Sequence, residues 1–575
     1  MAADVRSWLT TSVVTLSLSL ILFAYERALV PLYGTGPTNY HLAPILLSAM
    51  LASAGQPLHV SRRYSLLLSA IALSAAPKAT YWVGVITSRR KQPIFGSAFT
   101  HASVLGPLAF VLTTYLVKSD SRIQQASRHS VLKHLGIAFI SYWTTLQLSR
   151  ALWPRVALLR RISDSQIHLT LAFLAYSVWI ATYLKVTATS KHRVKTYQLK
   201  FMIFVALTAS WFWLLQPILT SPILPHPLPA PYTRPDYPLR ILSAEQSVTG
   251  LIIVAEVLPH ERNAEVHSIR YLRASHSILG GVWLYGDLDN QQPMTDSFDT
   301  YLGDSIYAAF VLQEAVRFVN STGRAGQMKD GLIIGLGVGI SATAFHRYGI
   351  STTIVEIDPA VYDAARRYFD LPDPGPGRVF LEDARRWVSR QKLVDSKVLF
   401  DFVVHDCFSG GGIPEHIYTL EFWSDLSTLV EPEGVVAVNY AGIVKSESAR
   451  LVLYTLLKVF GQCRAFHDRT ESNELTRERY ETHSTNMIIF CTRSRSPLTF
   501  RTAQDSDYLG SSLRRRVLAS LADREVDIGS ILDGDGDRYI LRDGDGRLTR
   551  QQEGQGHYHW KVMREVLEDV HWETY

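Results

Sequence analysis

Uncharged apolar runs dominate roughly the first third of the chain. Four runs contain no Asp, Glu, Lys or Arg, namely Trp8–Tyr25, Gln92–Val117, Ser165–Leu184 and Phe201–Thr233. Less clean runs lie near residues 41–58, 66–87 and 134–153. About 20 apolar residues cross the hydrocarbon core of a bilayer, whereas a soluble helix shows a polar face at the helical period. The pattern therefore predicts a multi-pass α-helical membrane bundle of about seven helices over residues 1–220, with a buried soluble bundle as the alternative.

A proline-rich stretch ends this apolar part. Residues 216–240 contain eight prolines, a composition that favours extended polyproline II, and we place a linker at residues 221–242. Beyond it, short runs at Gly250–Val257 and His267–Leu272 read as strands. We therefore expect a β-rich segment with a lead-in helix over residues 243–320.

Strand and helix patterns then alternate from residue 321 to 495, which indicates an α/β sheet with crossover helices. The expected strands are Leu332–Leu336, Thr353–Ile357, Val379–Leu381, Phe400–Asp406, Val435–Asn439, Phe460–Phe466 and Asn486–Cys491. They predict a Rossmann-like, seven-stranded sheet that is mostly parallel, with one antiparallel hairpin strand. Residues 496–575 read as a polar C-terminal extension.

A glycine-rich turn follows the first of these strands. Gly335, Gly337 and Gly339 allow a tight turn and close approach to a ligand, and the next helix offers free N–H groups. Glu356 ends the second strand, where an acid reaches ribose hydroxyls in nucleotide-binding folds. The dinucleotide fingerprint needs a glycine where Ile340 stands, so the pattern favours S-adenosylmethionine over NAD.

Two further acids follow the third and fourth strands. Asp383 can accept a hydrogen bond from an adenine amino group while the N–H of Ala384 meets a ring nitrogen, and a simple helix cap is the alternative. Asp406 ends the fourth strand, at the edge where ligands of open α/β sheets collect. Its neighbour His405 is expected to point into the core, and Cys407 has no adjacent His or Lys that would make it a nucleophile.

Charge separates the two parts of the chain. Residues 1–215 contain 21 Lys and Arg against 4 Asp and Glu, which leaves 37 basic and 48 acidic residues for the remainder. The basic part suits an anionic membrane surface, and the acidic part argues against nucleic acid. Cys407, Cys463 and Cys491 have no CxxC spacing, so we expect neither a metal site nor a disulfide framework, and a reducing compartment.

Four motifs occur in a fixed order in the second part of the chain. GLGVG, VEIDP, EDARRWV and FDFVVHDCFSGGGIPEH lie within a region of similarity from about residue 245 to 490. Together they resemble the spermidine synthase family of class I S-adenosylmethionine-type transferases. The layout, with membrane helices ahead of this domain, resembles membrane-fused synthase-like proteins of fungi.

The resemblance implies a role for each candidate residue. The three loop glycines would line the nucleoside–methionine moiety of S-adenosylmethionine or its decarboxylated form, Glu356 would hold the ribose, and Asp383 with Ala384 the adenine. Asp406 would lie beside the sulfonium and the reacting amine, and Tyr307 would help to form the acceptor pocket. The catalytic candidates are therefore Asp406 and Tyr307.

The chain departs from the family at two positions. An acid of the family's glycine loop is replaced by Val338, and the second aspartate of its fourth-strand motif by Ser409. Val338 cannot bind an ammonium group, and Ser409 cannot act as a general base without activation. Aminopropyl transfer to a polyamine stays open if another acid, such as Glu415, completes the pocket. Methyl transfer to another nucleophile is the alternative, and a catalytically degenerate membrane scaffold or sensor is the third.

Partners and location follow from these expectations. The partners would be a lipid bilayer and a small-molecule amine or other nucleophilic acceptor, without nucleic acid. The chain would be a multi-pass integral membrane protein. Because S-adenosyl donors are cytosolic, the transferase domain is expected on the cytosolic side.

Overall fold

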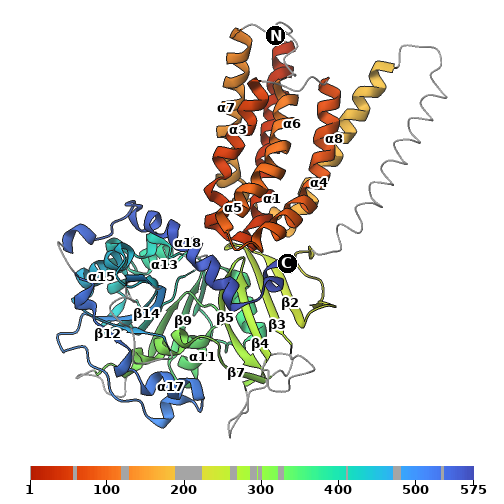
Figure 1. The fold of residues 1–575 in the computed structure, drawn as a ribbon. Coiled ribbons are helices and arrows are strands. Elements are labelled where there is room, and N and C mark those ends of the chain that lie inside the picture. The colour runs from red at the N-terminus through yellow and green to blue at the C-terminus, as the bar shows by residue number, and fades with distance from the viewer. Residues whose placement is uncertain are drawn as a thin grey trace. The chain divides into compact units, whose positions relative to one another are not determined.

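The computed structural model divides the chain into two compact units (Figure 1). It describes residues 2–55, 61–117, 128–187, 223–258, 268–284, 294–295, 301–320, 329–395, 397–408, 412–469, 481–482, 484–532 and 536–575. Unit 1 comprises Met1–Pro229 and Trp560–Tyr575, and unit 2 comprises Ala230–His559. The C-terminal segment thus groups with the N-terminal helices and not with the residues that precede it.

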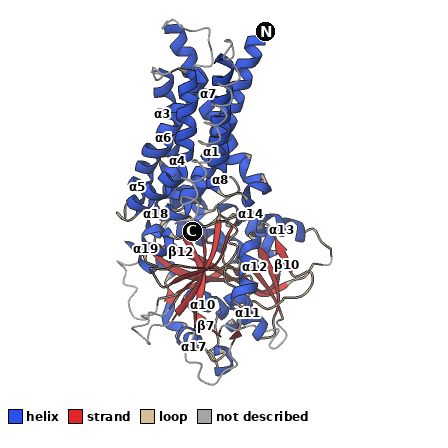
Figure 2. Ribbon diagram, turned by 90° about the vertical axis from the view of Figure 1, so that its right-hand side faces the viewer, coloured by secondary structure: helices blue, strands red, loops and turns tan. Residues whose placement is uncertain are grey.

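Unit 1 is helical, and its long helices run side by side (Figures 1 and 2). Its N-terminal helices are α1 (Ala2–Tyr33), α2 (Thr35–Tyr40), α3 (Leu42–Gly55), α4 (Arg62–Ser88), α5 (Pro93–Thr100), the π-helix η1 (His101–Leu105), α6 (Gly106–Val117), α7 (Arg128–Ala151), the 3-10 turns η2 (Trp153–Arg155) and η3 (Ala157–Arg161), and α8 (Asp164–Thr187). Six of the seven predicted runs fall on these helices. The seventh, Phe201–Thr233, lies mostly outside the described residues.

Three segments of the described chain are long and apolar enough to cross a membrane. They are Leu9–Tyr33, Tyr64–Ser88 and Pro93–Val117. The predicted seven-helix bundle is therefore not confirmed. Length explains one difference, because the 14 residues of α3 span about 21 Å, less than the ~30 Å of a hydrocarbon core.

Unit 2 begins with an antiparallel sheet in the order β1-β2-β3-β4-β5-β7-β6. Its strands are β1 (Tyr232–Thr233), β2 (Leu239–Gln246), β3 (Leu251–Val257), β4 (Ser268–Ala274), β5 (Ser277–Leu284), β6 (Met294–Thr295) and β7 (Tyr301–Ser305). The lead-in helix follows as α10 (Ala308–Leu312) and the 3-10 helix η4 (Gln313–Phe318). This sheet is larger than the short strand runs of the sequence indicated, because two-residue strands extend it.

The second sheet has eight strands in the order β10-β9-β8-β11-β12-β14-β13-β15. They are β8 (Asp330–Ile334), β9 (Ser351–Glu356), β10 (Val379–Leu381), β11 (Phe400–His405), β12 (Val430–Ile443), β13 (Gln462–His467), β14 (Ser484–Thr492) and β15 (Glu525–Val526). Among the first seven strands in this order, β14 alone runs antiparallel to the rest, so the predicted Rossmann-like, mostly parallel sheet is confirmed. β15 adds an eighth strand, which is antiparallel to β13.

Helices connect these strands and cover the sheet. They are α11 (Ile340–Arg347), α12 (Pro359–Tyr368), α13 (Ala384–Gln391), η5 (Glu415–Ile417), α14 (Leu420–Ser427), α15 (Glu447–Phe460), η6 (Asp505–Tyr508), α17 (Ser512–Ala519), η7 (Ala522–Arg524), η8 (Ile528–Ser530), η9 (Gly536–Tyr539) and the first part of α18 (Arg547–Val566). The end of α18, from Trp560, and α19 (Asp569–Glu573) belong to unit 1. Asp358 caps α12 by accepting from the N–H of Ala360, and Pro359 occupies the first helical position, as the sequence predicted. Apolar cores fill both faces of the sheet.

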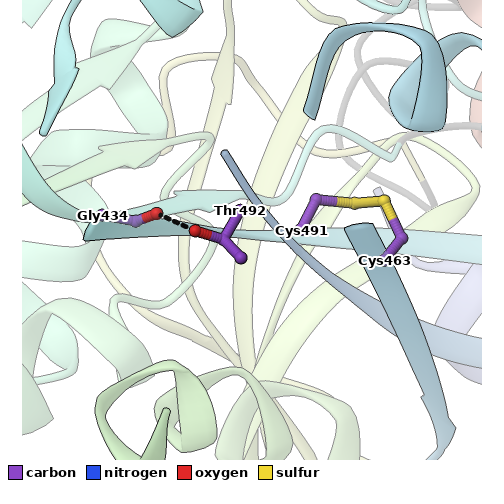
Figure 3. Close-up of a disulfide and its surroundings, with 4 residues drawn as sticks. All are labelled: Gly434, Cys463, Cys491 and Thr492. Atoms are coloured by element: carbon purple, nitrogen blue, oxygen red, sulfur yellow. Dashed lines mark hydrogen bonds between the residues drawn. A yellow bond between two sulfur atoms is a disulfide. The ribbon is translucent and has the colours of Figure 1, made fainter. Parts of the chain in front are cut away.

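One disulfide joins the two hairpin strands of this sheet (Figure 3). Cys463 on β13 pairs with Cys491 on β14, and the hydroxyl of the adjacent Thr492 donates to the carbonyl of Gly434 at 2.9 Å. This corrects the expectation of no disulfide. The pairing depends on the register of two strands that the cysteine spacing does not reveal.

The last residues of the chain pack into unit 1. The indole N–H of Trp560 donates to the carbonyl of Leu32 at 2.8 Å, and the hydroxyl of Tyr575 donates to the carbonyl of Ala28 at 2.9 Å. Arg89 forms two bonds of 2.7 Å with the carboxylate of Glu573. These contacts complete the helical unit with residues that are last in the sequence.

Candidate functional site

Four neighbouring parallel strands end at one edge of the larger sheet. In spatial order the strands are β10, β9, β8 and β11. Asp383, Gly335 and Asp406 follow β10, β8 and β11, and Glu356 is the last residue of β9. The N–H of Asp406 donates to Ile334 at 2.8 Å, which ties the ends of β11 and β8 together. The structure thus gathers the predicted donor residues at one sheet edge, and their individual roles stay predictions.

The glycine loop follows a backbone path that requires glycine. Gly335, Gly337 and Gly339 have φ values of 81°, 54° and 83°, in the left-handed region. A Cβ on Gly335 would lie 2.2 Å from the carbonyl oxygen of Asp406, and one on Gly337 would lie 2.6 Å from that of Leu279. The loop is therefore held directly against the end of β11 and against β5.

Glu356 fixes the glycine loop from the second strand. Its carboxylate accepts from the N–H of Leu336 at 2.7 Å and from the N–H of Asp358 at 2.9 Å. The side chain is buried. Burial raises its pKa to about 7, although the two hydrogen bonds lower it. Each carboxylate oxygen keeps a further lone pair with which to accept a ribose hydroxyl.

The carboxylate of Asp406 is held between two amides. Gln313 donates to one oxygen at 2.7 Å and Asn439 donates to the other at 2.8 Å. The hydroxyl of Ser341 donates to the carbonyl of Gln313 at 2.7 Å, which sets the orientation of that amide. Burial raises the pKa of Asp406, and the two amides lower it. The side-chain amide oxygen of Asn439 is buried and bonds to no described residue, so it is an acceptor that a substrate N–H could use.

A narrow pocket lies between the glycine loop and Asp406. Its walls include Leu279, Phe310, Gln313, Val338 and Asp406. Its volume is about 10 Å³, room for about one water molecule. The methionine end of a donor would therefore have to part these walls. The residues of this edge fit an adenosyl sulfonium compound, because the predicted acids Glu356, Asp383 and Asp406 lie at the ends of β9, β10 and β11.

The adenine end of the predicted site is more open. Asp383 accepts from the N–H of Arg386 at 3.1 Å as the cap of α13, and its other oxygen meets Nε2 of His416 at 2.7 Å. Bonding to His416 lowers the pKa of Asp383. The two side chains are 34% and 54% exposed, so a base could reach them. Ala384 begins α13, with its N–H at the helix start.

Tyr307 packs against a residue of the pocket wall. The Tyr307 hydroxyl is buried and bonds to no described residue, and its ring packs against Phe310, which lines the pocket. Burial, and then the charge of Asp468, raise the pKa of Tyr307. The sequence offered no signal for Gln313 or Asp468. Asn439 could have been found, because it lies on the fifth strand at the same edge.

Two other residues that the sequence placed near the site, Glu415 and His405, have structural roles. Glu415 accepts from the N–H groups of Gly546 and Thr549 at 2.5 and 2.9 Å, so it caps α18 and does not complete an acidic pocket. The ring of His405 is fully buried against Tyr418 and Trp423, as expected of a core residue.

Cys407 and Ser409 follow Asp406 in the chain. Burial raises the pKa of the Cys407 thiol, so it lacks the character of a nucleophile. Ser409, which stands where the family has an aspartate, lies outside the described residues.

Val338 is an integral part of the core between the two sheets. It is 2% exposed and packs in a cluster with Val254, Leu272 and Val282 of the antiparallel sheet. A Cβ on Gly280 would lie 2.8 Å from it. An acid at this position would enter an apolar cluster, so the departure from the family pattern matches the packing of this chain.

Replacing Val338 by aspartate is expected to destabilise unit 2 by about 3 kcal/mol or more, because an unpaired carboxyl group would be buried. Val338→Ala, the control that removes apolar contacts alone, should cost about 2 kcal/mol. Denaturant unfolding of the purified full chain measures both. A Val338→Asp protein as stable as Val338→Ala would show that the side chain reaches solvent.

No known family model matches the chain. The chain is 36% identical over 345 residues to the N-terminal histidine N-methyltransferase of Emericella nidulans, covering 58% of each protein. It is 36% identical over 143 residues to the polyamine aminopropyltransferase of Vibrio vulnificus, covering 24% of this chain and 46% of that protein. The chain thus spans about half the length of these curated relatives.

A probable spermidine synthase from Corynebacterium glutamicum is similar in structure to 49% of this chain and 94% of its own, with 16% identity and a TM-score of 0.33.

Proposed function

We propose that unit 2 is an S-adenosylmethionine-dependent N-methyltransferase whose acceptor is a histidine at the N-terminus of a polypeptide. An alignment over 345 residues with a protein named for that reaction supports the acceptor. The sheet order and the strand-end acids support the donor. The three apolar segments of unit 1 support attachment to a membrane.

The observation that carries this proposal is the composition of the pocket around Asp406. Among the described residues, its lining contains one carboxylate, Asp406, and one amide, Gln313. The amide of Asn439 also donates to Asp406. A polyamine is a multiple cation at neutral pH, and each ammonium must be bound and one deprotonated before attack. An imidazole has a pKa of about 6.5 and is mostly neutral at pH 7, so it needs little help to become a nucleophile.

The reaction is a displacement at the methyl carbon of the donor. The acceptor nitrogen forms the new N–C bond with its lone pair while the S–C bond breaks and its electrons pass to sulfur. The attacking atom is the ring nitrogen that carries no proton, and the other ring nitrogen releases its proton after the transfer. Asp406 would accept the N–H of the acceptor and receive or relay that proton, and Asn439 would hold the acceptor through its side-chain amide oxygen.

Aminopropyl transfer is the second candidate, because a polyamine aminopropyltransferase aligns with 143 residues of the chain. Its acceptor site would have to use Asp406, Asp468 and the Tyr307 hydroxyl. Asp468 accepts from the amide of Asn486 at 3.0 Å, and its charge raises the pKa of Tyr307. Burial raises the pKa of Asp468, which disfavours the carboxylate that an ammonium group needs.

The proposal is tested with the purified full chain. S-adenosylmethionine and a synthetic peptide that begins with histidine should give a product heavier by one methyl group, located on the first residue by fragment mass spectrometry. The same peptide with alanine first, or with histidine second, should stay unmodified. Consumption of putrescine with decarboxylated S-adenosylmethionine, and no peptide methylation, would replace the proposal by the second candidate. Binding of neither donor in calorimetry would remove both.

Donor binding is expected to strengthen with rising pH through Glu356. Its pKa of about 7 means that the carboxyl is largely protonated at pH 6 and ionised at pH 8. If the ionised form accepts the ribose hydroxyls, the Kd for S-adenosylmethionine should fall by about tenfold over that interval. Calorimetry at several pH values measures it. Glu356→Gln should bind weakly and with a flat profile, and a pH dependence that survives in Glu356→Gln would assign the titration to another group.

A further inference from the structure

The disulfide of unit 2 lies inside the protein and not on its surface. Cys463 and Cys491 stand directly opposite each other in the register of β13 and β14, with a sequence separation of 28. Figure 3 shows the bond passing from one strand to the other. The two residues are 7% and 0% exposed and belong to the apolar core that contains α15.

Burial of this kind distinguishes a structural disulfide from one that exchanges. A redox-active pair must be accessible, and its attacking thiolate must be stabilised by nearby positive charge or a helix end. The next residues on the same faces of the two strands, Ala465 and Ile489, are fully buried and apolar. This bond is therefore formed during folding and then kept.

Disulfides persist in oxidising compartments and are rare where cellular reductants keep thiols reduced. We infer that unit 2 folds and works in an oxidising compartment, which is the reverse of the cytosolic side expected from the donor pool. Closing the bond is a two-electron oxidation. The two thiols lose two protons and two electrons, and the electrons pass to a disulfide-bearing oxidoreductase of that compartment.

This placement also identifies the class of reaction that supplies the acceptor, a step that rests on the proposed function. Translation begins with methionine, so a polypeptide has histidine first only after the peptide bond before that histidine is hydrolysed. Polypeptides that enter a secretory compartment lose their targeting segment by such a hydrolysis. The acceptors are then secretory polypeptides that are methylated after this cleavage.

The cysteines of the full chain report the state of the bond. Yeast cells that express it are lysed directly into acid to stop thiol exchange. The denatured protein is then labelled with N-ethylmaleimide, reduced and labelled with iodoacetamide. Peptide mass spectrometry should find N-ethylmaleimide on Cys407 and iodoacetamide on Cys463 and Cys491 in nearly all molecules. N-ethylmaleimide on all three cysteines in most molecules would overturn the inference.

Cys407 is the internal control, because it is a free thiol in the same chain. The double variant Cys463→Ala, Cys491→Ala controls for peptide assignment. Protease treatment of sealed membrane vesicles gives a second readout. Residues 230–559 should resist digestion until detergent is added, and digestion in sealed vesicles would overturn the inference.

Neither readout depends on methyl transfer, so the two proposals can fail separately. If the pair is oxidised but the protein does not methylate the histidine peptide, the inferred compartment stands and the proposed function fails. If the pair is reduced but the protein does methylate the peptide, the proposed function stands, and the inferred compartment and the processed secretory acceptors both fail.

Discussion

Replacing Asp406 by asparagine is expected to lower the kcat of methyl transfer by about 10²–10⁴, with the Kd of the donor changed by less than about threefold. The substitution keeps the shape of the side chain but removes the group that accepts the acceptor's N–H. It also places an amide against Gln313 and Asn439, whose NH₂ groups both donate to the carboxylate. Single-turnover kinetics and calorimetry on the full chain measure the two quantities.

A matched control is present on the same strand. Asp401 is also buried and accepts from the N–H groups of Lys329 and Asp330, but it lies at the start of β11, away from the edge where Asp406 ends it. Asp401→Asn should lower stability and leave kcat within about twofold. Equal kcat losses in the two variants would mean that Asp406 acts through the fold and touches no substrate.

Replacing Gly335 by alanine is expected to abolish donor binding and to destabilise unit 2 by about 4 kcal/mol. Two costs combine, because the residue has a φ of 81° and its Cβ would lie 2.2 Å from the carbonyl oxygen of Asp406. Relief of that clash must move the end of β11, and a displacement of about 1 Å can lower the rate by 10²-fold. Thermal unfolding and calorimetry provide the measurements.

Gly349 separates the two costs. Its φ is 74°, and a Cβ there would meet nothing within 4 Å. Gly349→Ala should therefore cost only the backbone strain of about 1–2 kcal/mol and should retain donor binding. If Gly335→Ala behaved like Gly349→Ala, the close approach of the glycine loop to β11 would not exist in solution.

The sequence was informative where structure follows from local pattern. The apolar runs of β8, β9 and β11, each closed by glycine or an acid, predicted both the strands and the edge at which Gly335, Glu356 and Asp406 meet. Parallel strands place their carboxyl ends together, so this geometry needs no knowledge of side-chain contacts. The cap at Asp358 is equally local.

What the sequence did not predict depends on contacts between distant segments. Gln313 reaches Asp406 across 93 positions of the chain, and Asn439 reaches it across 33. The disulfide depends on the register of a hairpin, and the buried position of Val338 on the antiparallel sheet that packs over it. In unit 1, three of the seven predicted spans are supported by length and composition in the described part of the chain, because an uncharged run does not reveal where its helix ends.

The return of the chain to unit 1 has a consequence for biosynthesis. Trp560, Trp572 and Tyr575 are buried in a unit whose other residues leave the ribosome first. Proteins usually fold from the N-terminus as they are synthesised, but this helical unit lacks part of its packing until residues 560–575 have been added. A stop codon before residue 560 would thus leave the helices of residues 2–187 without these contacts.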